Sequence, residues 1–342
     1  MVTTPVRWGL LSTAAINGAV VEGCVGSALV ELAAVGSRNL ERARTWASAR
    51  GIANVHGSYE SLLDDSSIDA IYISVPNSLH IPWVVRALEA GKHVLCEKPL
   101  SGRREAVAEA FNASERAGRL LAEAFMYRFH PQTAQVRTLL AERMIGPVRW
   151  VRSTHSFAMD SPATDVRLST ALDGGALMDV GCYCVSAFRL FAGEPICVTG
   201  HAIRAPSGVD LRFAGTLVAA DGATGQFDCA MDLPRRNGLE IVGSDGSIWV
   251  PDPWHCRGAP LELRAGRVRE KVATSQQSPY RSEFEAVSRA IRGDIMLEFG
   301  RDDALAQAAV LEALQSSAAG GVAREIPVLP RVNEPRRPTA RA

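Results

Sequence analysis

The chain has 342 residues, of which 47% are hydrophobic, and its 37 basic side chains balance 37 acidic ones. This balance gives no broad field for nucleic acid or an anionic membrane surface, and the length suits two domains. No apolar run reaches the roughly 18 residues of a membrane span, and the first residues lack the charged start of a secretory signal. We therefore expect a cytoplasmic protein whose seven cysteines are buried free thiols.

The first third of the chain alternates between strand and helix patterns. Apolar runs typical of buried strands occur at residues 6–11, 30–37, 68–75, 92–97 and 120–125. Helical patterns lie between them, at residues 14–25, 40–50, 81–90 and 103–117. Strands that alternate with helices of about ten residues imply βαβ units with right-handed crossovers. The sequence therefore predicts an α/β Rossmann domain over residues 1–126, with a doubly wound parallel sheet.

The pattern changes after a helix expected at residues 131–142. Short strands separated by turns are expected at residues 148–157, 196–204, 210–219, 225–231, 239–243, 247–250, 261–265 and 267–274. Helices to cover one face of this sheet are expected at residues 178–192, 282–293 and 303–317. We predict an α+β domain over residues 127–330 with a largely antiparallel open sheet. The tail at 331–342, rich in Pro and Arg, is expected to be disordered.

A candidate nucleotide site lies where the first strand meets the first helix. A dinucleotide fingerprint would have glycines at three positions where this chain has Ser12, Ala14 and Asn17. These residues are still small or polar, so we expect Ser12, Thr13, Ala14 and Ile16 to border a pyrophosphate at the helix N-terminus. An ordinary helix N-cap would show the same pattern.

The end of the second strand indicates which cofactor is bound. NAD sites usually have a carboxylate there, whereas this chain has Ser37 and Arg38. The planar guanidinium of Arg38 suits a 2′-phosphate, with Ser37 as an additional donor. The alternative is a solvated surface arginine, of which Arg42 and Arg44 are examples. We predict NADP in preference to NAD, with NAD still possible.

A lysine follows the fourth apolar run, where Glu97, Lys98 and Pro99 end the strand. Proline stops the strand there, so the ammonium is expected at the carboxyl edge of the sheet, where ligands bind in open α/β folds. We expect Glu97 and Lys98 to border the cofactor. Pro76, Asn77 and His80, which follow the third strand, are expected at the same edge, and His80 is equally well explained as a packing or capping histidine.

Asp179 and Tyr183 lie four residues apart at the glycine-rich start of an apolar helix. That spacing places a carboxylate and a phenol on one helical face. A helix-dipole acid and a core tyrosine would give the same pattern. Cys182 and Cys184 lie on other faces with no histidine close in sequence, so they predict no metal site.

These residues together resemble the Gfo/Idh/MocA oxidoreductases. The resemblance rests on the Glu97-Lys98-Pro99 strand end, the Asp179-x-Gly181-x-Tyr183 helix, residues 122–131 and the order of the two domains. Many members carry histidine where this chain has Tyr183. Tyrosine there is similar to the branch with glucose–fructose oxidoreductase, dimeric dihydrodiol dehydrogenase, NADP-dependent xylose dehydrogenase and deoxysugar ketoreductases.

The resemblance implies hydride transfer between nicotinamide and a carbinol or carbonyl carbon of a sugar or polyol. Tyr183 would act as the acid/base, its pKa of about 10 lowered by Lys98, while Asp179 orients the substrate or Lys98. Whether Tyr183 or Lys98 carries the proton stays open. Possible sugar or pocket contacts are Tyr127, Arg128, His130 and Arg167.

Other functions fit the same residues. The substrate could be a cyclic diol such as a dihydrodiol, relatives of the family carry out redox-assisted glycoside hydrolysis with bound NAD, and others are non-catalytic NADP sensors. Fold alone does not decide among them. The resemblance also implies a homodimer or homotetramer that forms through the open face of the second sheet.

Overall fold

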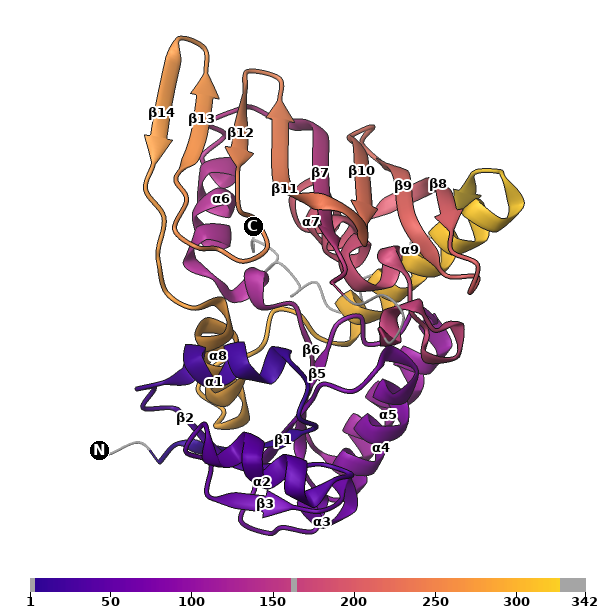
Figure 1. The fold of residues 1–342 in the computed structure, drawn as a ribbon. Coiled ribbons are helices and arrows are strands. Elements are labelled where there is room, and N and C mark those ends of the chain that lie inside the picture. Colours follow the sequence, from indigo (N-terminus) through magenta and orange to yellow (C-terminus); the bar gives the residue numbers. More distant parts are fainter. Residues whose placement is uncertain (1–3, 161–164, 327–342) are drawn as a thin grey trace, which may run out of the picture.

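The computed structural model describes residues 4–160 and 165–326. The tail predicted to be disordered, residues 331–342, lies outside the described residues. Figure 1 shows two parts, one built from the indigo and purple first third of the chain and one dominated by the magenta to orange strands that follow. The yellow C-terminal helix runs along the second part.

The first part is built on a six-stranded sheet in which every neighbouring pair of strands is parallel. Its order, β3-β2-β1-β4-β5-β6, is that of dinucleotide-binding folds, and confirms the predicted Rossmann sheet. The order reverses between β1 and β4, which opens a crevice at the carboxyl edge. The elements are β1 (Val6–Leu11), α1 (Ile16–Cys24), β2 (Val30–Gly36), α2 (Leu40–Ser48), β3 (Asn54–His56), α3 (Tyr59–Leu63), β4 (Ala70–Ile73), η1 (Asn77–Leu79), α4 (His80–Glu89), β5 (His93–Glu97), α5 (Arg104–Ala117) and β6 (Leu121–Ala124).

The sequence did not predict β3 and α3. The strand has only three residues, all partly exposed, so it shows no apolar alternation. The helix owes its start to a capping box between Ser58 and Ser61, and it is held by Leu62, which is fully buried against Gly36. Such short elements depend on tertiary contacts rather than on periodicity.

The second part is a nine-stranded sheet of order β14-β13-β12-β11-β7-β10-β9-β8-β15. All its neighbouring pairs are antiparallel except β7 and β10, so the predicted, largely antiparallel sheet is confirmed. Helices α6, α7 and α9 lie behind it in Figure 1, and its other face is open. The elements are η2 (Met126–Phe129), α6 (Pro131–Ala141), β7 (Val148–Ala158), η4 (Val166–Leu168), η5 (Thr170–Leu172), a π-helical turn η6 (Leu177–Gly181), α7 (Cys182–Ala192), β8 (Pro195–Arg204), β9 (Asp210–Ala219), β10 (Thr224–Ala230), β11 (Asp232–Gly243), β12 (Gly246–Val250), β13 (Leu261–Ala265), β14 (Val268–Val272), α8 (Pro279–Ile291), α9 (Arg301–Gly320) and β15 (Arg324–Glu325).

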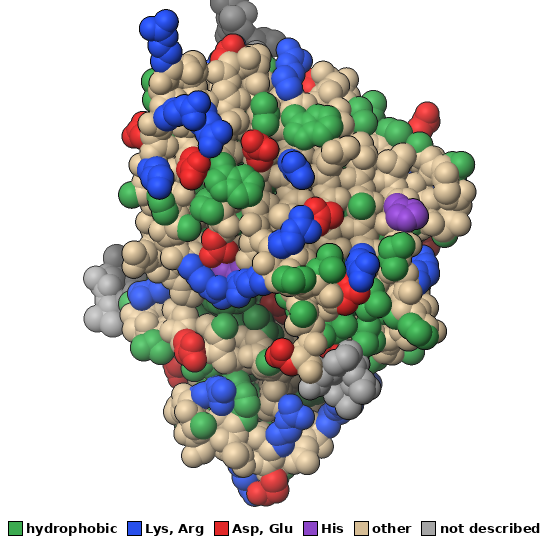
Figure 2. Space-filling model, turned by 45° about the horizontal axis from the view of Figure 1, so that its top comes forward, with side chains coloured by type: hydrophobic (Ala, Val, Ile, Leu, Met, Phe, Trp, Pro, Cys, Tyr) green, Lys and Arg blue, Asp and Glu red, His purple; other side chains and the backbone are tan. Residues whose placement is uncertain are grey.

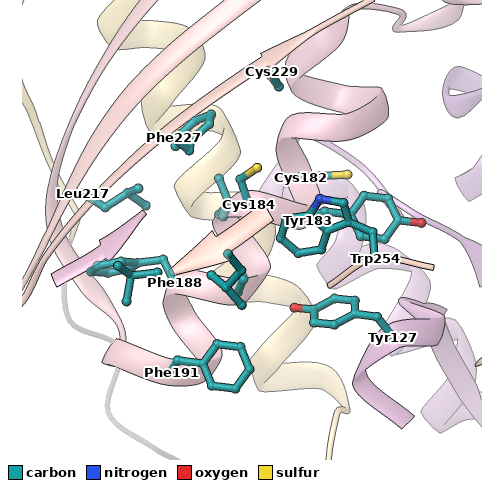
Figure 3. Close-up of a cluster of buried hydrophobic side chains, with 14 of the residues drawn as sticks. Tyr127, Cys182, Tyr183, Cys184, Phe188, Phe191, Leu217, Phe227, Cys229 and Trp254 are labelled. Atoms are coloured by element: carbon teal, nitrogen blue, oxygen red, sulfur yellow. The ribbon is translucent and has the colours of Figure 1, made fainter. Parts of the chain in front are cut away.

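A hydrophobic core fills the space between this sheet and its helices. In Figure 3, Phe188 and Phe191 of α7 lie near Leu217 and Phe227 of the strands. The segment Thr170–Ala192 is long and apolar enough to cross a membrane by composition, which the sequence reading did not recognise. Because 83% of that apolar window is buried inside the protein, it is the core helix of this sheet.

Figure 2 shows acidic and basic side chains interspersed with large hydrophobic ones on one face of the molecule.

Helix α8 covers the parallel sheet, although the sequence predicted it on the antiparallel one. Its Phe284 ring lies 4.8 Å from that of Trp8 on β1, and Ser288 accepts a hydrogen bond from the Trp8 indole at 3.1 Å. The periodicity of α8 correctly predicts a helix with one buried face. It carries no information about which sheet that face meets.

A buried ion cluster joins the two parts. The Arg128 guanidinium pairs with Asp303 of α9, which also lies 3.0 Å from Arg189 of α7. Next to it, Glu123 of β6 accepts the Leu100 amide at 2.8 Å through Oε1, while its Oε2 is buried without a partner among the described residues. Burial raises the pKa of Glu123 to about 7, against the opposing effect of the Arg128 charge.

This raised pKa makes folding depend on pH. The protonated Glu123 is compatible with burial, so its contribution is fully present below the unfolded-state pKa and is lost as the pH rises through about 7. Urea unfolding should show wild type losing about 2–3 kcal/mol relative to Glu123→Gln between pH 4.5 and 7. Glu109 lies on the exposed surface of α5, so the free energy of unfolding of Glu109→Gln should change with pH in parallel with that of wild type. Parallel curves for wild type and Glu123→Gln would contradict the assignment.

Candidate active site

The loop between β1 and α1 is strained at Ser12. Its φ is +128°, in the region that favours glycine, at the position where a fingerprint has its first glycine. The hydroxyl oxygen lies 2.9 Å from Ser74 Oγ and 3.1 Å from Ser74 O, and it accepts the Ala14 amide at 3.1 Å. The Ser12 hydroxyl therefore holds the loop against the end of β4, and the contact of this residue with a pyrophosphate stays a prediction.

The rest of this loop suits an anionic ligand. Helix α1 begins at Ile16 with no side-chain cap. The amides of Asn17 and Gly18 donate to the carbonyl oxygens of Ala14 and Ala15 at 3.1 Å, and the turn lies beside Thr13. Helix N-termini of this kind hold phosphate groups, so the chemistry of the loop fits a dinucleotide.

Two arginines lie beside this loop. Arg38 follows β2 and is exposed, as expected, whereas the Ser37 hydroxyl accepts the Asn39 amide at 3.2 Å. Arg42, in the first turn of α2, reaches the β1–α1 loop and lies 3.5 Å from the Thr13 carbonyl oxygen. The sequence alone gives Arg42 as a solvated surface arginine, and no local pattern indicates its contact with the β1–α1 loop.

His80 has a structural role. It is 1% exposed, and its two ring nitrogens lie 2.9 Å from the carbonyl oxygens of Val75 and Pro99. Burial lowers its pKa to about 4. The imidazole thus ties together the ends of β4 and β5, which corrects the prediction that it borders the cofactor.

The neighbouring residues Pro76 and Asn77 remain half-buried at the crevice. The side-chain Nδ2 of Asn77 donates to the Asp173 carbonyl oxygen at 2.8 Å. It therefore connects the first part of the molecule to the loop that precedes η6.

Lys98 lies at the carboxyl edge of β5, as predicted. Its Nζ donates to the Asp179 carbonyl at 2.7 Å and lies 3.4 Å from Asp179 Oδ1. Burial alone would lower the pKa of Lys98, but the Asp179 charge raises it above its ordinary value. Behind it, Glu97 accepts hydrogen bonds from the Tyr72 hydroxyl and the Lys98 amide. The ammonium is therefore charged and held in place.

Asp179 lies in the π-helical turn η6, a rare geometry that recurs at functional sites. Its second carboxylate oxygen is 3.3 Å from the Arg167 guanidinium. Glycines allow the chain before η6 to lie close to its neighbours. A Cβ at Gly174 would lie 2.1 Å from the Arg167 carbonyl oxygen, and one at Gly175 would lie 2.2 Å from the Asp210 carboxylate. Asp179 thus bridges two cations from different elements.

Tyr183 is nearly completely buried, one turn after Asp179. Lys98 Nζ lies 5.0 Å from the centroid of its ring, and the hydroxyl is 3.3 Å from Met126 Sδ. Burial raises the pKa of Tyr183 well above 10, and the Glu97 charge adds to the effect. The predicted lowering by Lys98 is absent because the ammonium faces the ring and is paired with Asp179. In this structure Tyr183 is a neutral phenol.

Three of the four predicted substrate contacts are used inside the protein. The Tyr127 hydroxyl bonds to Ser186, and Arg128 belongs to the ion cluster described above. His130 accepts the Gln132 amide as the cap of α6, and its Nε2 lies 2.9 Å from a backbone carbonyl. Of the four, only Arg167 keeps a substantially exposed side chain, 37%.

Buried aromatic side chains that the sequence did not identify pack around Tyr183. His155 of β7 lies 5.3 Å from the Tyr183 ring, and Trp254, which follows β12, lies 5.7 Å from it, between ring centroids. Figure 3 shows Tyr127, Tyr183 and Trp254 at one end of the core. Trp254 and His155 come from distant segments, and only the inward alternation along β7 hinted at His155. No cluster of three or more metal-ligating side chains occurs in residues 4–160 and 165–326.

Comparison with known proteins agrees with this architecture. Residues 17–125 match the family model described as "Oxidoreductase family, NAD-binding Rossmann fold", and residues 133–249 match the "GFO/IDH/MocA C-terminal domain". The chain is 37% identical to D-xylose 1-dehydrogenase (NADP(+)) 2 of Haloferax volcanii, over 93% of this chain and 99% of that protein.

Two further similarities differ in the named substrate. The chain is 33% identical to trans-1,2-dihydrobenzene-1,2-diol dehydrogenase of Xenopus laevis, over 72% of this chain and 75% of that protein. The crystal structure of a 3-ketoreductase from Actinomadura kijaniata, in complex with NADP and TDP-benzene, superposes with a TM-score of 0.85 at 28% identity, covering 92% and 98% of the two chains. With both family models and a full-length relative in agreement, the chain belongs to the Gfo/Idh/MocA family of oxidoreductases, which includes enzymes named for sugars and diols.

Proposed function

We propose that the protein is an NADP-dependent oxidoreductase that transfers hydride between nicotinamide and a carbinol or carbonyl carbon of a sugar or polyol. The observation that carries this proposal is the placement of Lys98. Its ammonium lies between the Asp179 carboxylate and the Tyr183 ring at the carboxyl edge of the parallel sheet. That edge is where the nucleotide binds in this fold. A cytoplasmic location remains our expectation.

Tyr183 and Lys98 have complementary roles in this proposal. A neutral phenol can donate a proton to the carbonyl oxygen during reduction, which leaves a phenolate. Oxidation is the reverse step, in which that phenolate takes the proton of the alcohol. Lys98 has three N–H donors, of which Asp179 accepts two, so the third is free to polarise the same oxygen. When bound, NADP would supply or accept the hydride. Asp179 holds Lys98 and is itself paired with Arg167.

Replacement of the two groups tests the mechanism. We expect Lys98→Met and Tyr183→Phe each to lower kcat by about 10²-fold or more, the usual contribution of general acid–base catalysis, while NADP still binds. The substrate for these assays is identified first, by an absorbance screen with NADP⁺ and NADPH over aldoses, ketosugars, nucleotide-linked ketosugars and cyclic diols.

Tyr59→Phe is the matched control, since Tyr59 packs against Trp83 in the first part of the molecule. Near wild-type turnover in both active-site variants would refute the mechanism. Glycoside hydrolysis with no net consumption of NADPH would support the redox-assisted glycosidase instead. No turnover of any kind with tight NADP binding would support a sensor.

The cofactor preference rests on the two arginines near the β1–α1 loop. Arg38→Ala and Arg42→Ala should each weaken NADP binding about tenfold, because each substitution would remove a charge-assisted hydrogen bond to the 2′-phosphate. The dissociation constant of NAD should not change. Arg44→Ala is the control, because Arg44 is exposed and paired with Glu41 at 2.7 Å. Equal effects on the two cofactors, measured by fluorescence titration, would rule out the 2′-phosphate contact.

A cyclic diol is the second candidate substrate. The Tyr183 ring is surrounded by Phe125, Tyr127 and Trp254, with centroids 5.4, 6.0 and 5.7 Å away. These three rings are buried in the core, so this candidate rests on the relative that is named for dihydrodiol oxidation.

We further propose that the protein is a homodimer or homotetramer through the open face of the second sheet. Trp150 and Trp249 alternate with buried residues along β7 and β12, so they lie half-buried on that face. A shallow hollow of about 410 Å³, lined in part by Arg152, His201 and Asp228, lies on the same sheet. Antiparallel sheets can leave one face to solvent, but two tryptophans there favour a partner.

Light scattering at micromolar concentration should give the mass of two or four chains. Trp150→Asp should shift it toward one chain, because a buried unpaired charge disfavours association. Met296→Asp should have no effect, as Met296 is 93% exposed in a loop. A single-chain mass for the wild-type protein would exclude this assembly.

A further inference from the structure

One buried carboxylate of the second sheet has no role in the proposed proton transfer. Asp210 begins β9 and is 8% exposed. Its Oδ2 accepts the backbone amide of Leu177, the first residue of η6, at 2.7 Å. Arg204, which lies opposite it on β8, donates instead to the Gly208 carbonyl oxygen at 2.8 Å. Asp210 therefore directs its buried charge at the start of η6.

The segment that Asp210 contacts has no cap of its own. Ala176 precedes η6 and has no side-chain oxygen that could accept a helix amide. The first amides of a helix need such an acceptor, and the helix dipole also favours a negative charge there. Burial raises the pKa of Asp210 to about 6, while the amides of Leu177 and Ala176 and the Arg204 charge act in the opposite direction. At neutral pH Asp210 is therefore mainly ionised, and it caps η6 from a neighbouring strand.

The chain before η6 leaves room for this carboxylate. Gly175 has a φ of +119°, and a Cβ there would lie 2.2 Å from Asp210 Oδ1. Any other residue would push the carboxylate away from the Leu177 amide. The Gly175 carbonyl in turn accepts the Asp179 amide at 2.9 Å. The contact with Asp210 is therefore continuous with the turn that carries Asp179.

Leu177 is also the residue on which the π-helical turn closes. The Cys182 amide donates to the Leu177 carbonyl, five residues back, whereas an α-helix bonds four residues back. This difference of one residue is a rotation of about 100° around the helix axis. Because α7 is fixed in the core, a change from π to α would turn Asp179 away from Lys98, whose Nζ donates to the Asp179 carbonyl at 2.7 Å.

We propose that Asp210 is a positioning residue of the active site, which caps η6 from β9, keeps this turn π-helical and so holds Asp179 against Lys98. Without the cap, the Lys98 ammonium would lose the carboxylate that offsets its burial. Its pKa would then fall, because burial alone disfavours the charged form. The effect on catalysis rests on the proposed oxidoreductase function, whereas the contact itself does not.

Lysine NMR follows this ion pair directly, since the chain has only three lysines, Lys92, Lys98 and Lys271. The protein is labelled with ¹³C at the lysine Cε, and the Lys98 signal is assigned by its absence in Lys98→Met. In wild type this signal should not titrate below about pH 10, because the Asp179 charge raises the pKa of Lys98 above its ordinary value. In Asp210→Ala the titration midpoint should fall by about one pH unit or more. Asp179→Asn should give a similar fall, and the double variant no further one.

Kinetics tests the effect on catalysis. We expect Asp210→Ala to lower kcat about 10- to 100-fold, the usual cost of misplacing a catalytic group, while NADP binds with wild-type affinity. The loss should grow as the pH rises toward the lowered pKa of Lys98, so the shape of the pH profile should change. A purely structural role would reduce the amount of active enzyme and scale kcat equally at every pH.

Two further variants separate capping from folding. Asp210→Asn keeps one oxygen that can accept the Leu177 amide, so it should restore part of both readouts, and it decides the question if Asp210→Ala does not fold. Asp221→Ala is the matched control, because the Asp221 carboxylate accepts the Ala223 amide at 3.0 Å in the turn that follows the same strand. It should leave kcat and the Lys98 titration unchanged.

Each outcome decides the inference. A lowered Lys98 midpoint together with a pH-dependent loss of kcat supports it, with Lys92 as the unchanged reference in every spectrum. An unchanged Lys98 midpoint in Asp210→Ala overturns it, as does an unchanged kcat beside a lowered midpoint. If wild type turns over neither sugars nor diols, the proposed function falls, while the NMR titration, which needs no substrate, still decides whether Asp210 holds the pair.

Discussion

The ion pair between Lys98 and Asp179 is the contact on which the site depends. Lys98 ends a strand of the first sheet, whereas Asp179 lies in the π-helical turn before the core helix of the second. The pair crosses the crevice and explains why the ammonium keeps its charge in spite of burial, since the carboxylate offsets the desolvation. A two-part pocket with a fixed cation at its centre follows from this single contact.

The same pairing sets the state of Tyr183. Because the ammonium is directed at Asp179 and at the face of the phenol ring, it does not counteract the burial that keeps the hydroxyl protonated. In the mechanism that we propose, the phenol therefore donates the proton and Lys98 polarises the carbonyl oxygen. Proton donation from a neutral phenol suits the reduction of a carbonyl. In the reverse step the proton returns from the substrate hydroxyl to the tyrosine oxygen.

Several polar residues near the crevice hold the scaffold rather than the substrate. His80 joins the ends of β4 and β5, and His130 caps α6. Arg128 is enclosed by the ion cluster, with its guanidinium 4.5 Å from the Phe125 ring centroid and paired to Asp303. Each is a residue type that also binds ligands, and residue type and position along the chain do not show the burial and pairing that hold these three within the protein.

The sequence by itself determined the parallel first sheet, the antiparallel second sheet, the family and the position of Lys98 at a strand end. These follow from local periodicity, from proline at strand ends and from residues close together in the chain. Only the tertiary structure decided that α8 covers the first sheet, that Arg42 reaches the β1–α1 loop and that His155 and Trp254 pack against Tyr183. Those contacts join segments far apart in sequence, and the burial that raises the pKa of Tyr183 exists only once they form.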